Sequence, residues 1–122
     1  MTPVQPNITI KYQENVTIIT FTQTKILEQS DIAALQDSIL SVIEQAGSIN
    51  LILDFSNVQF LSSSVLGLLI RISKRVYNAE GQLALCSIIP KIYEIFKITR
   101  LTNIFDIYDS VESAIQAFSP GK

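Results

Sequence analysis

The sequence contains no histidine and a single cysteine, Cys86. Without histidine, the chain cannot build a Ser-His-Asp or a Cys-His catalytic unit. Histidine is also the commonest transition-metal ligand, and one cysteine cannot hold a structural zinc ion by itself. We therefore expect no catalytic residue, no metal site and no cofactor, and we interpret the protein as a binding module and not as an enzyme.

Clusters of charge and long hydrophobic runs are also missing. The 9 lysines and arginines and the 11 aspartates and glutamates are spread along the chain, and the net charge is −2. Nucleic-acid binding would need clustered basic residues, and a membrane span would need about 20 apolar residues in a row. The first residues lack the basic and apolar segments of a secretion signal. Since one cysteine cannot form an internal disulfide, we expect a cytoplasmic protein that binds no nucleic acid and does not insert into a membrane.

Hydrophobic periodicity predicts a single α/β domain over residues 1–122, with an ordered core from about 7 to 118. Apolar and polar residues alternate at 8–12, and β-branched residues are frequent at 16–22, which predicts an antiparallel hairpin. Unbroken apolar runs at 51–55 and 82–88 are typical of strands covered on both faces, as in a parallel sheet. The predicted order is β-β-α-β-α-β-α-β-α, with a mostly parallel central sheet and about four helices.

Capping residues predict where several helices begin. Ser30 is expected to cap a helix that begins at Asp31. Pro90 stands at the first position of a later helix, where a missing N–H group costs nothing. Asp109 and Glu112 have the spacing of an acidic capping box for the last helix.

Three consecutive serines, Ser62, Ser63 and Ser64, follow a polar loop and start the next predicted helix. In α/β folds, functional residues gather where strands end and helices begin. A helix N-terminus offers unpaired N–H groups and a partial positive charge, so the fold would tolerate a phosphate there, and the new charge would alter a binding surface. The alternative is structural: Ser62 or Ser63 caps the helix, since serine is a preferred capping residue.

The helix that follows the serines carries two adjacent apolar stripes. The first comprises Val65, Leu69, Ile72 and Val76, and the second comprises Leu66, Ile70, Ser73 and Tyr77. One stripe is enough to pack a helix on a sheet. The second either forms an exposed docking patch beside the serines or is buried as well, and the pattern leaves both alternatives open.

Asp54 lies near the end of a predicted parallel strand, where an aspartate could accept a phosphoryl group, as in response-regulator receivers. Those domains also need an acidic pair after their first strand, and this region of the chain offers only Glu14 and Glu28. We therefore interpret Asp54 as a residue that braces the following loop. Cys86 is interpreted as a buried strand residue, because free cysteine is so often buried.

The segment 53–69, LDFSNVQFLSSSVLGLL, resembles the signature of STAS domains, and specifically that of bacterial anti-sigma factor antagonists. The segments 81–86, 90–92 and 96–107 also look like the family, so the resemblance covers nearly the whole chain. It implies a STAS-like fold. It also implies that Ser63 is the phosphoacceptor, with Ser64 and Ser62 as second choices. Because Ser62 stands where the family has Asp and Val65 where it has Gly, the chain resembles a divergent branch.

The resemblance implies a binding switch that regulates transcription. In the family, the unphosphorylated antagonist binds an anti-sigma factor that is also a serine kinase, phosphorylation releases it, and a serine phosphatase restores it. The residues expected to contact the partner surround the serines: Ser62, Ser63, Ser64, Val65, Leu66 and Ile70. The alternative, which the missing Asp motivates, is a constitutive STAS scaffold or accessory subunit of a stress-signalling or transport complex, without phosphorylation.

Overall fold

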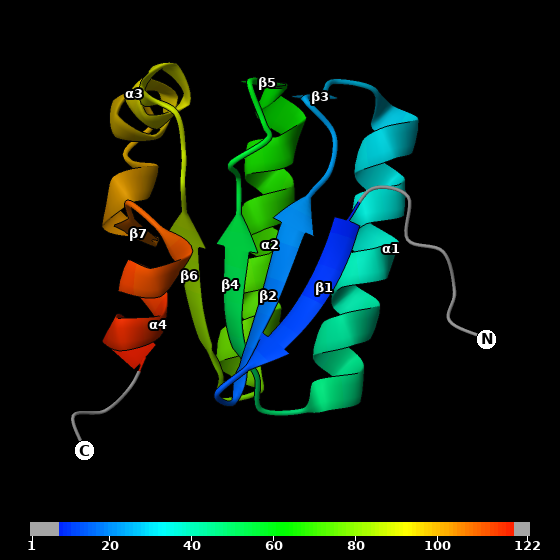
Figure 1. Cartoon of the computed structure of the whole chain (residues 1–122). Coiled ribbons are helices and arrows are strands. Elements are labelled where there is room, and N and C mark those ends of the chain that lie inside the picture. Colours follow the sequence, from blue (N-terminus) through cyan, green and yellow to red (C-terminus); the bar gives the residue numbers. More distant parts are fainter. Residues whose placement is uncertain (1–7, 119–122) are drawn as a thin grey trace.

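The computed structural model describes residues 8–118, which form one α/β unit (Figure 1). Asn7, where the ordered core was expected to begin, lies outside the described residues. The elements, in chain order, are β1 (Ile8–Gln13), β2 (Val16–Phe21), β3 (Lys25–Ile26), α1 (Gln29–Ala46), β4 (Asn50–Asp54), β5 (Phe60–Leu61), α2 (Ser63–Asn78), β6 (Gln82–Cys86), α3 (Pro90–Ile98), the 3-10 turn η1 (Leu101–Asn103), β7 (Asp106–Tyr108) and α4 (Val111–Phe118). The predicted fold class is confirmed, and two short strands, β3 and β5, are added to the predicted order.

Five strands form the main sheet in the order β1-β2-β4-β6-β7. The first two are antiparallel, and the others pair in parallel. The turn between β1 and β2 consists of Glu14 and Asn15, whose φ angles are 53° and 68°. Positive φ at both central residues is what a tight type I′ hairpin turn requires. The predicted hairpin is therefore present, and its turn twists with the strands that it joins.

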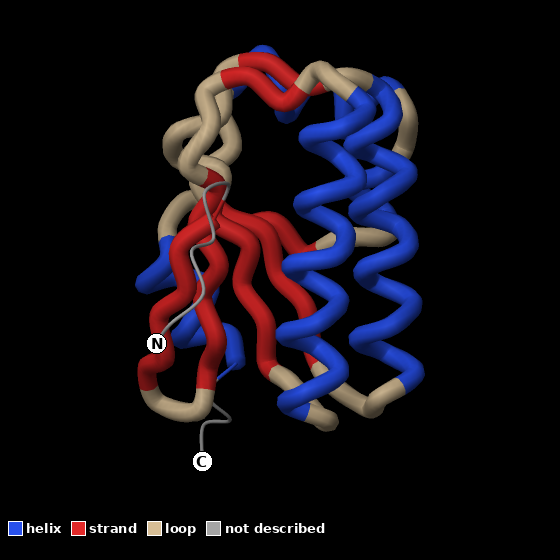
Figure 2. Tube along the Cα trace, turned by 90° about the vertical axis from the view of Figure 1, so that its right-hand side faces the viewer, coloured by secondary structure: helices blue, strands red, loops and turns tan. Residues whose placement is uncertain are grey.

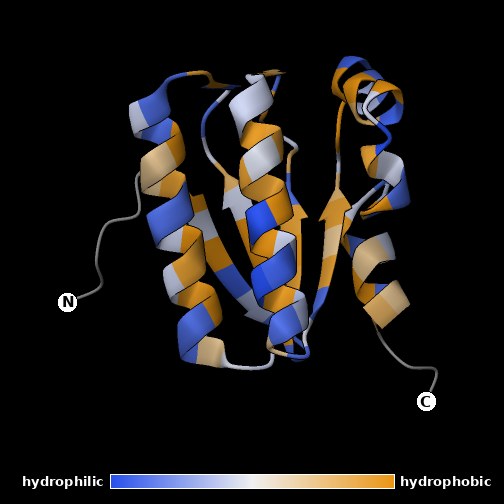
Figure 3. Cartoon of the chain, turned by 180° about the vertical axis from the view of Figure 1, so that it is seen from behind, coloured by the Kyte–Doolittle hydropathy of each residue, from blue (hydrophilic) through white to orange (hydrophobic). Residues whose placement is uncertain are grey.

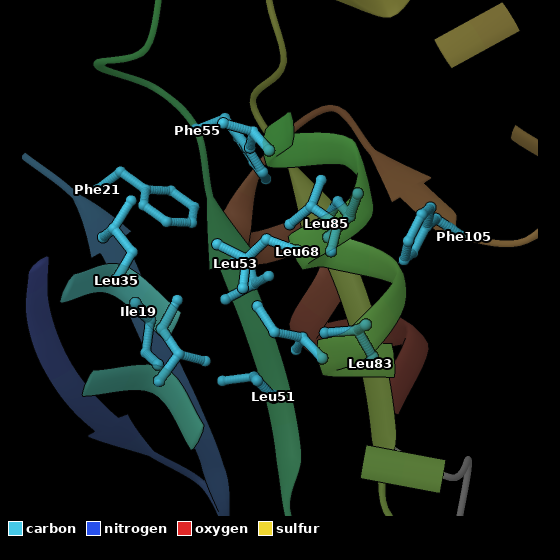
Figure 4. Close-up of a cluster of buried hydrophobic side chains, with 14 of the residues drawn as sticks. Ile19, Phe21, Leu35, Leu51, Leu53, Phe55, Leu68, Leu83, Leu85 and Phe105 are labelled. Atoms are coloured by element: carbon cyan, nitrogen blue, oxygen red, sulfur yellow. The ribbon is translucent and has the colours of Figure 1, made fainter. Parts of the chain in front are cut away.

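Helices cover both faces of this sheet (Figure 2). Leu51 and Leu53 of β4 belong to the large core cluster, which also contains buried residues of α1 and α2. Figure 4 shows Leu53 next to Leu68 of α2, and Leu35 of α1 beside Phe21 and Ile19 of β2. Ile52 lies in a smaller cluster with residues of α4. Both faces of β4 are covered, which explains its unbroken apolar run.

In Figure 3, α1 and α2 carry hydrophilic and hydrophobic residues, whereas β6 is mostly hydrophobic.

The prediction that Ser30 caps the first long helix is wrong. The capping position is Glu28, whose backbone is extended with φ −94° and ψ 145°. Its carbonyl oxygen accepts a bond from the N–H of Ile32 at 3.1 Å, so helical bonding has already begun before Ser30. The predicted position of Pro90, in contrast, is confirmed, because it stands in the first turn of α3.

The acidic capping box predicted for α4 is also wrong. The hydroxyl of Ser110 accepts a hydrogen bond from the backbone N–H of Ser113 at 3.1 Å. Ser110 directly precedes the first residue of α4, so its short side chain reaches the free N–H groups of the first turn. Asp109 lies one residue too early for this role.

Gly81 connects α2 to β6 in a space that excludes any side chain. A Cβ atom there would overlap the backbone of Ile49. We expect Gly81→Ala to lower the free energy of unfolding by about 2 kcal/mol in urea denaturation, because the backbone must move apart. Gly67→Ala is the matched control. Its Cβ would meet only Arg71 Nη1 at 3.7 Å, so it should stabilise α2 by about 0.5–1 kcal/mol. Equal stability of the two variants would contradict the close approach at Gly81.

Candidate functional site

The three serines lie at the end of the molecule where the parallel strands end and α2 begins (Figure 1). Between β4 and α2, the chain pairs in parallel with β3, with Lys25 opposite Phe60. The carbonyl oxygen of Thr24 accepts the N–H of Gln59 at 2.8 Å, and that of Ile26 accepts the N–H of Ser62 at 3.0 Å. The small sheet of β3 and β5 therefore holds the backbone up to the first serine.

Asp54 is 9% exposed and joins three parts of this region. One carboxylate oxygen accepts the backbone N–H of Ser56 at 3.0 Å, and the other accepts the hydroxyl of Thr20 at 3.1 Å. A little further on, the side-chain amide of Asn57 donates to the carbonyl oxygen of Phe21 at 3.0 Å. Both carboxylate oxygens of Asp54 therefore accept hydrogen bonds, one from β2 and one from the loop that follows β4. These two bonds hold the start of the loop against the sheet.

The three serine hydroxyls have different surroundings. Ser62 occupies the capping position of α2, with φ −87° and ψ 164°, but its side chain makes no capping bond. Its Oγ is buried and has no hydrogen-bond partner among residues 8–118. Ser64 is half-buried, and its Oγ accepts a bond from the side-chain amide of Gln29 at 3.3 Å. Ser63, the first residue of α2, is the exposed member of the three.

The sequence left two interpretations of the serines open, a helix cap and a site that can take a phosphate. The surroundings of the three hydroxyls decide between them only in part. Ser62 has the position and backbone angles of a cap without the hydrogen bond that defines one. Ser63 points its exposed side chain from a helix start, where the first N–H groups have no acceptor within the helix. The site thus combines a reachable hydroxyl with a place that favours negative charge.

Comparison with known proteins decides the family. The family model described as the STAS domain matches residues 7–114. The chain belongs to the STAS domain family. Its fold also matches solved structures of STAS proteins. One is an anti-sigma-factor antagonist (STAS) domain protein from Planctomyces limnophilus, with a TM-score of 0.82 at 24% identity over 93% of this chain and 98% of that one.

Two further structures are similar to this STAS domain. An anti-sigma factor antagonist from Mycobacterium paratuberculosis matches with a TM-score of 0.82 at 20% identity, over 98% of this chain and all of the other (100%). The Bacillus cell fate determinant SpoIIAA, in its phosphorylated form, matches with a TM-score of 0.68 at 17% identity, over 90% of this chain and 97% of that one. At these identities the likeness shows a shared fold.

Two of the residues that we expected to contact a partner are buried in the STAS domain. Val65 is 1% exposed and Leu66 is 8% exposed. Leu66 and Ser73 of the second apolar stripe are buried, and Ile70 packs partly against the same core. Of the two alternatives left open for this stripe, burial therefore holds over most of its length, and Tyr77 at its end is exposed. This stripe does not face α1, which α2 meets through Arg71 and Arg75. It lies on the side of β7, where burial and then the carboxylate of Asp106 raise the pKa of Tyr77.

Cys86 is fully buried, as predicted, on the sheet face that α4 covers. Burial in the first place, and then the nearby Asp54 carboxylate, raise the pKa of its thiol to about 12. The thiol therefore stays protonated at neutral pH, and a protonated buried thiol is a poor nucleophile and a poor metal ligand. Cys86 fills space in the core and contributes nothing to the serine site.

The described residues offer neither a metal site nor a membrane span. Residues 8–118 contain no group of three or more histidine, cysteine, aspartate or glutamate side chains placed to hold a metal ion. Over the same range, no helix has the length and hydrophobicity needed to cross a bilayer.

Sequence patterns missed the exposed apolar surface close to the serines. Phe60 is 42% exposed, and Lys91 Nζ lies 3.7 Å from the centre of its ring. Lys25 Nζ approaches the same ring at 5.5 Å. The three residues belong to β5, α3 and β3, so no periodicity along the chain could relate them. The one hint in the sequence was the apolar dipeptide Phe60-Leu61 after a polar loop. It was missed because a strand of two residues is too short to show alternation.

Proposed function

We propose that this STAS domain is an anti-sigma factor antagonist whose binding is regulated at Ser63. With an unmodified Ser63, it binds a kinase-type anti-sigma factor in the cytoplasm and so frees a sigma factor for transcription. Phosphorylation of Ser63 by that kinase ends the binding, and a serine phosphatase restores it. The observation that carries the proposal is the exposure of Ser63 at the first position of α2.

A kinase must bring the γ-phosphate of ATP against the acceptor hydroxyl. In the transfer, the Ser63 Oγ forms a bond to the γ-phosphorus, the bond from that phosphorus to the bridging oxygen of ADP breaks, and the hydroxyl proton passes to a base on the kinase. Ser62 offers no such access, because its Oγ is buried. Ser64 is less accessible than Ser63, since it is half-buried and bonded to Gln29. Accessibility therefore favours Ser63 among the three.

The helix start then supports the phosphorylated product. A phosphoserine adds about −1.5 to −2 charges and three acceptor oxygens. At the N-terminus of α2, these oxygens meet unpaired N–H groups and a partial positive charge, so the fold itself is not destabilised. A partner surface that fits the neutral hydroxyl meets the same charge without compensation. Phosphorylation is therefore expected to act on the complex and not on the folded state.

The test is incubation with a purified anti-sigma factor serine kinase of the same organism and ATP, followed by mapping of the phosphate by mass spectrometry. We expect one phosphate on Ser63, which Ser63→Ala removes. Ser62→Ala and Ser64→Ala are the matched controls, since they change neighbouring hydroxyls and should leave the modification in place. A phosphate on another residue would contradict the assignment of Ser63. No phosphate and no binding of the kinase would contradict the proposed function.

A further inference from the structure

An apolar groove opens between the small sheet and α3. Its volume is about 370 Å³, and it is lined by Leu27, Gln59, Phe60, Leu61, Lys91, Ile92 and Ile95. Figure 1 shows β3, β5 and α3 at one end of the molecule, which is also the end where α2 begins. Three of the lining side chains are large, hydrophobic and exposed: Leu27 by 49%, Phe60 by 42% and Ile95 by 37%. Contiguous apolar side chains left open in this way are typical of a binding surface.

The helix α3 extends this apolar surface beyond the groove. Ile98 lies three residues after Ile95, on the same side of the helix, and is 78% exposed. Ile92 and Phe96 of the same helix are buried in the core and hold α3 in place. The apolar side chains at 95 and 98 are therefore not needed to attach α3 to the domain, and they remain available to a partner.

Two lysines bring positive charge to the groove: Lys91 lines it, and Lys25 lies beside it, near the ring of Phe60. Lys91 and Lys25 lie over the ring of Phe60, at 3.7 and 5.5 Å from its centre. The ion pairs among the described residues join Arg75 to Glu44 and Lys97 to Glu94, so Lys25 and Lys91 are both unpaired. Among the described residues, no acidic side chain lines the groove. An unpaired ammonium group over an exposed aromatic ring can bind an anion on its free side while the ring contacts an apolar side chain.

The nearby carboxylates do not cancel this charge. Glu94 of α3 is held by Lys97 at 3.5 Å. Glu28 follows Leu27 and is exposed, but it does not line the groove. The groove therefore combines an apolar floor with one lysine in its lining, Lys91, and a second beside it, Lys25, which is complementary to a ligand that carries apolar and acidic groups together.

We propose that this groove docks an acidic amphipathic segment of a partner protein, with an apolar side chain against Phe60 and Ile95 and a carboxylate against Lys91 and Lys25. Charge disfavours the same surface of a second copy, because a symmetric contact would bring four ammonium groups together. A flat anionic membrane fits less well, since it cannot fill a concave groove.

The docking site is independent of phosphorylation, although it lies next to the serines. Leu61 lines the groove and precedes Ser63 by only two residues. A partner segment in the groove would therefore hold the rest of that partner beside α2. The inference stands on the groove itself, whether or not Ser63 accepts a phosphate.

The experiment is a selection of random 12-residue peptides displayed on phage against the folded domain, followed by affinity measurement with the enriched synthetic peptides. We expect enriched peptides to carry acidic and large apolar residues together. Lys91→Glu and Ile95→Asp should each weaken their binding by about tenfold or more, since each removes one kind of contact. The matched controls are Lys74→Glu and Ile104→Asp, which change an exposed lysine and an exposed isoleucine outside the groove and should leave the affinity unchanged.

Three results would overturn the docking site. The first is enrichment of peptides without acidic residues, or of none at all. The second is equal affinity for the wild type and both groove variants, with circular dichroism showing that all are folded. The third is self-association of the wild type, or binding to vesicles of anionic lipid, that the groove variants abolish in the absence of peptide binding. The Ser63→Ala variant should bind the peptides as the wild type does, which separates this test from that of the proposed switch.

Discussion

Replacing Ser63 by aspartate should weaken binding of the domain to its kinase-type anti-sigma factor by about 100-fold or more. The substitution places a permanent negative charge on the exposed side chain at the start of α2, where the partner is proposed to meet a neutral hydroxyl. Aspartate carries less charge than a phosphoserine, so the true phosphorylated form should bind more weakly still. Titration calorimetry with the purified kinase measures the loss.

The control for this prediction is Ser41→Asp. Ser41 is an exposed serine of α1, so its replacement adds the same charge to the surface at another place. We expect Ser41→Asp to bind as the wild type does. If Ser63→Asp also binds normally, the switch is contradicted, and the alternative of a constitutive STAS scaffold gains support, because such a scaffold has no need of a neutral residue 63.

Phe55→Ala should lower the free energy of unfolding by about 3–5 kcal/mol. Phe55 is 0% exposed, and its ring lies 4.8 Å from that of Phe21, centre to centre. Its backbone N–H donates to the carbonyl oxygen of Cys86 at 3.0 Å, so the residue stands directly after the sheet and starts the loop to the serines. Truncation leaves a cavity between β2 and α2 that the rigid sheet cannot close. Urea denaturation followed by circular dichroism measures the change.

Phe60→Ala is the matched control for Phe55→Ala, because the same side chain is removed from the same loop. Phe60 is 42% exposed, so we expect a loss below about 1 kcal/mol. Similar losses for the two variants would contradict the different burial of the two rings. Phe60→Ala should instead weaken peptide binding in the groove. Phe55→Ala therefore tests the stability of the fold, and Phe60→Ala tests binding.

The order of elements could be predicted because each long element has a pattern of its own. Alternation marked β1, β-branched residues marked β2, and apolar runs marked β4 and β6, which lie in the middle of the sheet and are covered on both faces. The short elements could not be predicted in this way. β3 and β5 have two residues each, so no period can be seen in them. They form because Thr24 and Ile26 offer carbonyl oxygens that the segment before Ser62 can reach.

The helix start at the serines and the place of Asp54 at the end of β4 could be predicted from the sequence. The functional roles of these residues stay predictions. The contacts expected at Val65 and Leu66 did not hold, because both side chains are buried. A helical stripe on the sequence does not reveal which neighbouring elements will cover it. Here α1 meets α2 through Arg71 and Arg75, whereas Tyr77 of the second stripe lies near Asp106 of β7.

The sequence by itself determined the fold class, the family signature at 53–69, and the absence of histidine-dependent chemistry, since each follows from residue types and their spacing along one stretch of chain. Only the tertiary structure decided which serine is exposed. The three residues are all serines, and their hydroxyls differ only in their surroundings. The Oγ of Ser62 is buried without a partner among residues 8–118, Ser63 is exposed, and the Oγ of Ser64 is bonded to Gln29. The groove likewise brings together Phe60 and Lys91, with Lys25 beside the ring of Phe60. Its burial and charge are set by segments that meet only when the chain is folded.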